Sequence, residues 1–387
     1  MWIPRNLEAV IPKIAETRPA LLLTGVRQSG KTTLLKKVFP DAAYVSLDRP
    51  MVAQGAEENP IRFLEQFDNA GQVIIDEIQY APQLFRELKI KIDEHRNRFG
   101  RWILTGSRKF ELMEHVSESL AGRLAIMHLD TLSVEELRRS GFFTDVNRSI
   151  WTGGYPELWA HDHIDPEYFF DAYIQTYLER DLRQIINVTN LRDFQRLIRA
   201  CAMRTGQLVN FSNLAKDVGV SANTVKSWLN VLETSGLLVL LSPYSANVKK
   251  RLVKAPKLYF SDTGLLCRLL NIRSEEELNG HIHEGNIWEN FVFTELAKDP
   301  RVSRNHLFFY RDQNNVEIDF LIETEGRTLL VEAKSSEHVE PSKLNFSKVE
   351  SVINGETHCI LACRHKEGYR ISLKAYDAVN PMTMTIF

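Results

Sequence analysis

The chain has 387 residues, more than one ordinary hydrophobic core accommodates, so two or three domains are expected. A net charge of −2 excludes a general attraction to nucleic acid, and no apolar run approaches the roughly 18 residues of a membrane span. Four cysteines are too few for a disulfide framework and the N-terminus lacks a signal peptide's apolar core, which together predict a cytoplasmic protein without membrane attachment.

A glycine-rich segment near the N-terminus follows a short apolar run. Residues 20–24 are predicted to form a buried strand, and residues 31–39 a helix. The segment between them, GVRQSGKT, matches the G-x-x-x-x-G-K-[ST] pattern in the strand, loop and helix context that this pattern requires. In such loops backbone N–H groups bind phosphate oxygens, the lysine reaches the β- and γ-phosphates, and the hydroxyl binds Mg²⁺. We therefore expect ATP to be bound by Gly25, Gln28, Ser29, Gly30, Lys31, Thr32 and Thr33.

Two further strands are predicted to carry acids and a hydroxyl to the same nucleotide. In QVIIDEIQ, residues 72–79, the strand ends at Asp76, which is expected in the Mg²⁺ shell, and Glu77 is expected to activate the attacking water. A helix-capping aspartate beside an exposed glutamate is the alternative. RWILTGS, residues 101–107, is a third strand, and Ser107 at its end is predicted to contact the γ-phosphate or the water, although strand ends often carry such residues as caps.

A helix rich in aromatic residues and leucine is predicted over residues 166–186. Its charged positions include Arg180 and Arg183, which are candidates for phosphate contacts. We interpret this helix as part of a lid over the nucleotide.

The next segment has the order of a winged helix-turn-helix. It reads as a helix over 211–218, a turn at Gly219, a helix over 221–233 capped by Ser221, and a β-rich stretch over 237–241. Because the second helix also carries several core-type apolar residues, a packing module is the alternative to DNA binding. Five basic residues then occur without an intervening acid, which suits contacts with DNA phosphates: Lys249, Lys250, Arg251, Lys254 and Lys257.

The C-terminal part reads as a helix, three strands, a helix and a strand. Asp319 lies on the second of these strands, and Glu332 and Lys334 lie on the third. Side chains alternate along a strand, so Glu332 and Lys334 share one face. Adjacent strands then bring Asp319 and Glu332 together, where they can share one Mg²⁺ or Mn²⁺ ion. Lys334 would position the attacking water, and Glu289 on the preceding helix would complete the ligand set.

This arrangement of a helical glutamate, Asp319 and the E-A-K tripeptide resembles the PD-(D/E)XK nuclease superfamily. The resemblance implies a Mg²⁺-dependent nuclease that hydrolyses phosphodiester bonds in DNA. Two alternatives stay open. The fold can have lost its activity, or the carboxylates and the lysine can form a satisfied charge network on a sheet edge.

Nine segments in fixed order span nearly the whole chain: TGVRQSGKTTLL, VIIDEIQ, LTGS, LAGR, GGYPE, TYLERDLR, KLYFSDTGL, WENFVFTEL and EIDFLIE with VEAK. Together they resemble a widespread bacterial and archaeal family of AAA-type P-loop ATPases with a nuclease-like C-terminal domain. The implied fold class is α/β, an AAA-type parallel sheet with a helical lid, a winged helix-turn-helix and a restriction-endonuclease-like α/β domain. The expected domains are residues 1–150 (ATPase core), 151–205 (lid), 206–275 (winged helix) and 276–387 (nuclease-like domain).

The AAA resemblance also implies a homo-oligomer, of which a hexamer is one form. In LAGR, Arg123 occupies a place where such proteins present an arginine to a neighbouring subunit's nucleotide, an interaction worth roughly 10³–10⁵ in rate. A plain surface arginine is the alternative. The predicted catalytic residues are Lys31, Glu77, Arg123, Asp319, Glu332 and Lys334. The predicted metal ligands are Thr32, Asp76, Glu289, Asp319 and Glu332.

Three functions compete on this basis. The leading one is an ATP-hydrolysing DNA-binding protein whose ATPase is coupled to the nuclease site. The second is a nucleotide-gated regulatory switch whose nuclease-like domain binds without cleaving. The third is a remodeller of a protein partner, which ATPase stimulation by that protein rather than by DNA would identify.

Overall fold

The computed structural model describes residues 1–106, 120–142, 145–176, 191–244, 255–353, 355–365, 371–372, 376–383 and 386. The chain divides into two compact units. The N-terminal unit comprises Pro4–Thr131 and Thr234–Gly236, and the C-terminal unit comprises Met1–Ile3, Leu132–Glu233 and Leu237–Phe387. The C-terminal unit thus contains nearly all of the segments predicted as lid, winged helix and nuclease-like domain.

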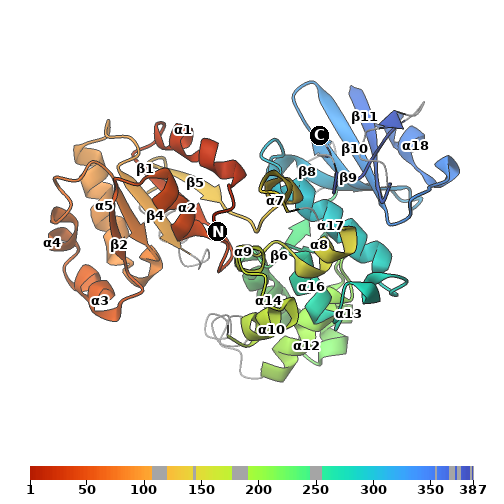
Figure 1. Ribbon diagram of the computed structural model, residues 1–387, viewed down its shortest axis with the longest axis horizontal. Coiled ribbons are helices and arrows are strands. Elements are labelled where there is room, and N and C mark those ends of the chain that lie inside the picture. Colours follow the sequence, from red (N-terminus) through yellow and green to blue (C-terminus); the bar gives the residue numbers. More distant parts are fainter. Residues whose placement is uncertain are drawn as a thin grey trace. The chain divides into compact units, whose positions relative to one another are not determined.

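The N-terminal unit is built on a parallel five-stranded sheet with the order β2-β3-β4-β1-β5 (Figure 1). All residues of β1, β3 and β4 are buried, as expected for apolar strands covered on both faces. Parallel pairing places the carboxyl ends of these strands on one edge, which brings the segment after β1 close to the ends of β3 and β4. The strands are β1 (Ala20–Thr24), β2 (Ala43–Ser46), β3 (Val73–Asp76), β4 (Trp102–Gly106) and β5 (Leu124–His128).

The helices α3, α4 and α5 pack on one face of this sheet. Leu22, Ile75 and Leu104 of the strands belong to the same buried cluster as Phe63 and Leu88 of the helices. The predicted helix after the glycine-rich segment is confirmed as α2. The helices of this unit are η1 (Asn6–Ala9), α1 (Ile11–Ala15), α2 (Lys31–Val38), α3 (Pro50–Glu58), α4 (Pro60–Glu65), η2 (Ile78–Tyr80) and α5 (Gln83–Glu94).

The C-terminal unit begins with a helical part. The turn between α13 and α14 has Gly219 at a φ of 85°, a left-handed conformation that glycine adopts without strain. The strands β6 (Leu238–Leu241) and β7 (Lys257–Phe260) then pair antiparallel. The predicted order of helix, turn, helix and strand is confirmed. The helices are α7 (Val134–Arg139), α8 (Val146–Thr152), α9 (Pro156–Ala160), α10 (Pro166–Tyr173), α12 (Leu191–Ala202), α13 (Phe211–Val218), α14 (Ala222–Thr234) and α16 (Thr263–Leu269).

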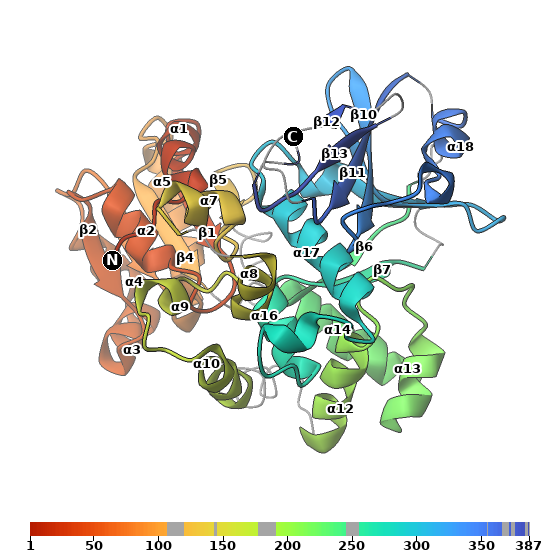
Figure 2. The same ribbon diagram turned by 45° about the vertical axis from the view of Figure 1, so that its right-hand side comes forward.

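A six-stranded sheet with the order β12-β13-β11-β10-β9-β8 forms the rest of this unit (Figure 2). Strands β8, β9 and β10 pair antiparallel, whereas β10 and β11 pair parallel, with α18 in the connection between them. The predicted order of one helix, three strands, a helix and a strand is therefore confirmed. The elements are η4 (Glu276–Leu278), α17 (Glu284–Lys298), η5 (Arg304–His306), β8 (Leu307–Arg311), β9 (Glu317–Glu323), β10 (Arg327–Lys334), η6 (Pro341–Lys343), α18 (Phe346–Glu350), β11 (Glu356–Cys363), β12 (Ile371–Ser372) and β13 (Asp377–Val379).

Helices cover both faces of this second sheet. Phe346 and Val349 of α18 share a buried cluster with Leu330 of β10. On the side of α17, the Trp288 indole donates a hydrogen bond to the Ala362 carbonyl at 3.1 Å. None of the helices in the described parts of the chain has the length and apolar character that crossing a bilayer requires.

Asp262, just before α16, joins two segments far apart in the chain. Its buried carboxylate accepts hydrogen bonds from the backbone N–H groups of Gly154 at 2.9 Å, Gly264 at 3.0 Å and Leu265 at 3.2 Å. Gly153 has a φ of 69°, and a Cβ there would lie 2.2 Å from the Asp262 carboxylate. The glycine pair of GGYPE therefore permits a close contact that caps α16.

Replacing Asp262 with alanine is expected to lower the free energy of unfolding by on the order of 3 kcal/mol, because three buried N–H groups lose their acceptor. Urea denaturation measures the change. Asp165→Ala is the matched control, since Asp165 caps α10 through one exposed bond to the Glu167 N–H, and its loss should cost about 1 kcal/mol. Equal effects of the two substitutions would contradict the role given to Asp262.

Candidate functional site

The glycine-rich loop has a backbone that requires glycine at two positions. Gly25 has a φ of 149°, and a Cβ on it would lie 2.2 Å from the Leu129 carbonyl oxygen. Gly30 has a φ of 91° and directly precedes α2. The exposed Gln28 also adopts a left-handed φ, of 63°. Glycine at position 25 thus has a steric cause, namely the close approach of the loop to the segment after β5, and glycine at position 30 has a conformational one.

Buried polar groups line the same loop. The Arg5 guanidinium donates to the Ser29 carbonyl at 2.8 Å and so holds the loop from the N-terminal side. The buried Ser29 hydroxyl has no hydrogen-bond partner among the residues that the structure describes. Thr33 lies exposed in the first turn of α2. An unsatisfied hydroxyl inside the loop and N–H groups at the start of a helix fit a bound phosphate.

Lys31 is buried with its ammonium inside the loop. Its Nζ donates to the carbonyl oxygens of Gly25 and Val26, at 3.0 Å each. Burial lowers the pKa of Lys31, although the negative charges of Glu77 and Asp76 oppose the shift. A phosphate anion at this position would restore a counter-charge next to the ammonium.

The carboxylate of Asp76, at the end of β3, accepts hydrogen bonds from three hydroxyl groups. The Thr32 hydroxyl lies 2.9 and 3.0 Å from its two carboxylate oxygens, and the Tyr44 hydroxyl donates at 2.9 Å. Thr105 of β4 also donates to this carboxylate. Burial, and then the bond to Asp76, raise the pKa of Tyr44 to about 12. The predicted pair of Thr32 and Asp76 is therefore brought together, and its oxygens are ligands of the kind that Mg²⁺ prefers.

Glu77 is held beside Asp76 in a left-handed conformation, with a φ of 55°. Its backbone N–H donates to the Thr105 hydroxyl at 3.2 Å, and the Gln79 amide donates to its carboxylate. Thr105 therefore positions both acids, a role that was not predicted from the sequence, although a hydroxyl residue at the end of this strand was the available signal. Ser107 lies outside the described residues, as do Arg180 and Arg183.

Arg123 lies beside the beginning of β1, where its carbonyl oxygen accepts a hydrogen bond from the Ala20 N–H at 3.2 Å. In a parallel sheet this is the edge opposite the glycine-rich loop. Its guanidinium pairs with Asp93, with Nε to Oδ1 and Nη2 to Oδ2 both at 2.8 Å. Arg123 is thus remote from the loop of its own chain, and its action on a neighbouring subunit's nucleotide stays a prediction.

The predicted C-terminal residues meet on neighbouring strands. The Lys334 Nζ lies 2.8 Å from Glu332 and 3.6 Å from Asp319. The Asp319 Oδ2 accepts a hydrogen bond from the Ala333 N–H at 2.8 Å, which links β9 to β10 beyond their regular pairing. The buried Glu332 Oε1 has no hydrogen-bond partner in the described part of the chain. Two carboxylates and one lysine are therefore together as predicted, and among the described residues one buried acceptor oxygen of Glu332 is without a hydrogen bond.

Lys257 of β7 is the main departure from expectation in this region. Its side chain is 3% exposed, so the prediction that it contacts DNA phosphates is wrong for this conformation. The Nζ lies 2.9 Å from Glu289, 2.5 Å from Glu317 and 3.7 Å from Asp319. The Tyr259 hydroxyl also donates to Glu289, at 2.6 Å. Glu289 thus contacts both Lys257 and Tyr259. These two residues alternate in KLYF and share one face of β7, which is the sequence signal that could have predicted their common partner.

The remaining basic residues of the predicted wing lie outside the described residues: Lys249, Lys250, Arg251 and Lys254.

Two carboxylates that contact Lys257 or Lys334, namely Glu289 and Glu332, have shifted pKa values. Burial, and then the charge of Asp319, raise the pKa of both Glu289 and Glu332 to about 7. Burial acts to lower the pKa of Lys257 and Lys334, but the surrounding carboxylates outweigh it and the net shift is upward. Within the described ranges, no group of three or more His, Cys, Asp or Glu side chains has the geometry to hold a metal ion.

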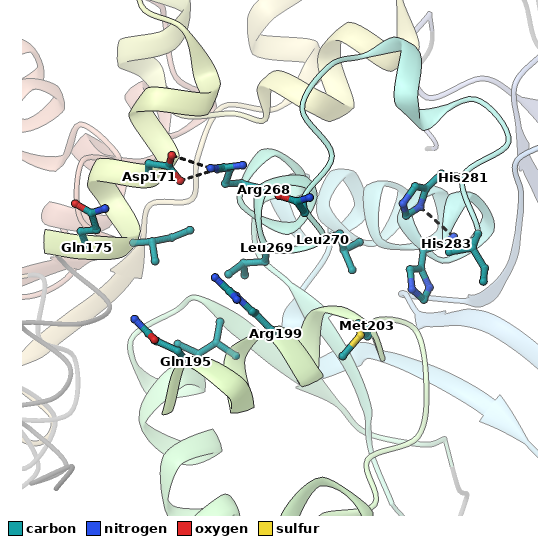
Figure 3. Close-up of a pocket in the computed structure, with 14 residues that line it drawn as sticks. Asp171, Gln175, Gln195, Arg199, Met203, Arg268, Leu269, Leu270, His281 and His283 are labelled. Atoms are coloured by element: carbon teal, nitrogen blue, oxygen red, sulfur yellow. Dashed lines mark hydrogen bonds and ion pairs between the residues drawn. The ribbon is translucent and has the colours of Figure 1, made fainter. Parts of the chain in front are cut away.

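A separate pocket of about 520 Å³ lies among the helices of the C-terminal unit (Figure 3). Its walls come from α10, α12, α16 and the segment around His281 and His283. Arg268 points to Asp171 and donates to its carboxylate at 2.6 and 2.7 Å, which neutralises its charge. The residues predicted for ATP, metal or catalysis are not part of its lining. This pocket is therefore distinct from the site around Asp76 and Glu77 and from the site around Asp319 and Glu332.

Three family models match successive parts of the chain. Residues 17–138 match an AAA domain. Residues 143–276 match a domain of unknown function, DUF8612, and residues 284–383 match a second one, DUF4143. The first match includes the glycine-rich loop, Asp76, Glu77 and Thr105, so the N-terminal site is that of an AAA domain.

Similar proteins come from bacteria and archaea. The uncharacterized protein Rv2008c of Mycobacterium tuberculosis is 32% identical over 338 residues, which cover 85% of this chain and 73% of that protein. The uncharacterized protein MJ1544 of Methanocaldococcus jannaschii is 23% identical over 340 residues, covering 80% and 73%. Among solved structures, the Walker-type ATPase PABY2304 of Pyrococcus abyssi aligns with a TM-score of 0.45 at 15% identity, over 70% of this chain and 96% of that one.

Proposed function

We propose that this protein, which belongs to the same family as the uncharacterized protein Rv2008c of Mycobacterium tuberculosis, is an ATPase whose nucleotide state governs a metal-dependent nuclease site acting on DNA. The observation that carries the proposal is the presence of two acid sites suited to phosphate chemistry in one chain. Asp76 and Glu77 lie beside a phosphate-binding loop, and Asp319, Glu332 and Lys334 meet on neighbouring strands.

In the ATPase half, Lys31 turns its ammonium from the loop carbonyls to the β- and γ-phosphate oxygens. Thr32 and Asp76 are the residues that would hold Mg²⁺, which neutralises phosphate charge when it is bound. Glu77 takes the proton of the attacking water, since its carboxylate is held next to Asp76 by Thr105 and Gln79.

A second copy of the chain is the proposed partner of the ATPase half. In a homo-oligomer, with a hexamer as one form, Arg123 would leave Asp93 and reach the neighbouring nucleotide. A native mass that is the same with and without ATP, and always that of a monomer, would remove this part of the proposal.

In the nuclease half, Asp319 and Glu332 are the residues that would hold Mg²⁺ or Mn²⁺, and the unpartnered Glu332 Oε1 fits that role. The bound ion would polarise the phosphodiester. Lys334 has a side chain that is 35% exposed, so it can turn from the carboxylates to position the attacking water.

DNA is the proposed substrate because of the surface of α14. Asn223, Lys226 and Ser227 are exposed on this helix, whereas Val225 and Trp228 are buried in the core. A helix with one polar exposed face, placed second in a helix-turn-helix, suits contacts with a DNA groove.

The test compares wild type with Lys31→Ala. Wild type is expected to hydrolyse ATP with Mg²⁺ and to cleave linear, circular or branched DNA at a rate that changes between ATP and ADP. Lys31→Ala should lose ATP turnover by roughly 100-fold or more, because the γ-phosphate loses its cation, and its cleavage should no longer respond to nucleotide.

Lys37→Ala serves as the control, since Lys37 is an exposed lysine on the same helix. Cleavage that is identical with ATP, ADP and no nucleotide would contradict the coupling. ATP turnover that survives in Lys31→Ala would contradict the ATPase assignment.

The second candidate is a nucleotide-gated switch whose C-terminal domain binds without cleaving. It is favoured by the contacts of Lys257, which already satisfy Glu289 and Glu317. This function predicts sequence-specific DNA binding without strand scission, and a cleavage product from wild type would exclude it.

A further inference from the structure

Lys257 is a buried cation that reaches the acid cluster from β7, outside the six-stranded sheet that carries most of the acids. Its Nζ lies within 2.9 Å of Glu289 and Glu317, and 3.7 Å from the Asp319 Oδ1. Arg311 also pairs with Glu317, at 3.2 Å, through the other carboxylate oxygen. The acids on this side of the cluster are therefore held by fixed positive charges of the protein.

The cluster has two cation positions, one on each side of Asp319. Lys257 faces the Asp319 Oδ1, whereas Lys334 faces the Asp319 Oδ2 at 3.6 Å and Glu332 at 2.8 Å. Asp319 thus turns one carboxylate oxygen to each of two cations. In two-metal phosphodiesterase sites, where the ions lie about 3.5–4 Å apart, a carboxylate shared by both metal ions has the same arrangement.

The two positions differ in how readily their lysine can leave. The Lys334 side chain is 35% exposed, and its partner Glu332 has a buried oxygen without a hydrogen bond among the described residues. The Lys257 side chain is 3% exposed and starts from a paired strand. Withdrawing Lys257 would leave buried carboxylates without a counter-charge, which is strongly unfavourable.

We propose that Lys257 is a resident cation in the place of a second metal ion, so that this site takes one divalent cation, at Asp319 and Glu332. This inference rests on the proposed metal-dependent function of the same site. It makes Lys257 a positioning residue, which fixes Glu289 and Asp319 and limits the number of metal ions.

The experiment counts Mn²⁺ ions bound to the full chain by electron paramagnetic resonance in wild type, Lys257→Met and Asp319→Asn, without nucleotide. Methionine keeps the length of the lysine but not its charge. Lys257→Met is expected to bind one ion more than wild type, and Asp319→Asn one ion fewer. Lys298→Met is the matched control, because the Lys298 side chain on α17 is 8% exposed and pairs with Glu295 at 3.6 Å, and the ion count of this variant should equal that of wild type.

Stability gives a second readout. In chelator, Lys257→Met should melt on the order of 10 °C below wild type, because buried acids lose their partner, and Mn²⁺ should recover most of this loss. If the variant folds only with Mn²⁺, that dependence supports the inference. The inference is overturned if Mn²⁺ does not restore the folding of Lys257→Met and does not raise its melting temperature more than it raises that of wild type.

The outcomes separate this inference from the proposed function. One ion at this site in wild type and one more in Lys257→Met support the inference. No ion in wild type, with one ion in Lys257→Met, removes both the metal-dependent nuclease and the single ion assigned to wild type. Wild-type binding that Asp319→Asn abolishes, with no additional ion in Lys257→Met, overturns the inference and leaves the proposed function in place. No ion in any variant overturns both.

Discussion

A protein carrying Glu77→Gln is expected to bind ATP as wild type does and to hydrolyse it at least roughly 100-fold more slowly. Glutamine keeps the size of the side chain and can keep the contact with Gln79, but it cannot take a proton from water. The neighbouring Asp76 and its contact with Thr32 are unchanged by the substitution, so the residues proposed to hold Mg²⁺ stay in place. Nucleotide binding by calorimetry and phosphate release measure the two effects separately.

Glu16→Gln is the control for this prediction, because Glu16 is an exposed glutamate in the same unit and should leave both quantities unchanged. Normal phosphate release by Glu77→Gln would show that another group activates the water. Loss of ATP binding would show instead that Glu77 acts on the structure of the loop.

Asp319→Asn is expected to reduce DNA cleavage roughly 100-fold or more while ATP turnover continues. Among the residues that the structure describes, Asp319 is the one acid that contacts both Lys257 and Lys334, and it also accepts a hydrogen bond from the Ala333 N–H. Asparagine can still accept that hydrogen bond through its carbonyl oxygen, so the link between β9 and β10 is kept. A loss of DNA cleavage therefore measures the effect of removing the negative charge of Asp319, and not a change of the fold.

Glu325→Gln provides the comparison, since Glu325 is exposed on the hairpin between β9 and β10. Supercoiled plasmid relaxation and linearisation, followed alongside ATP turnover, distinguish the two activities. Cleavage by Asp319→Asn at the wild-type rate would mean that the observed nuclease is a contaminant or uses other residues.

The strands, helices and motif residues of the N-terminal site followed from local patterns. β1 and α2 lie where the apolar run and the glycine-rich loop predict them, because both depend on residues that are neighbours in the chain. The meeting of Thr32 with Asp76, at 2.9 Å, was also predictable, because parallel strands end at one edge of the sheet. In the same way, side-chain alternation on β10 placed Glu332 and Lys334 together.

Other contacts could not be read from such patterns. A run of basic residues predicted Lys257 at the surface, but β7 turns it toward acids on α17 and β9, and it is buried. The strand ending in Thr-Gly-Ser predicted a hydroxyl of Ser107 near the γ-phosphate or the water, whereas the bonds of Thr105 to both acids depend on the pairing of β3 with β4. Sequence therefore determined the elements and the residue types of both sites. Which lysine meets which carboxylate depended on segments distant in the chain, because the environment of a side chain is set by its neighbours in space.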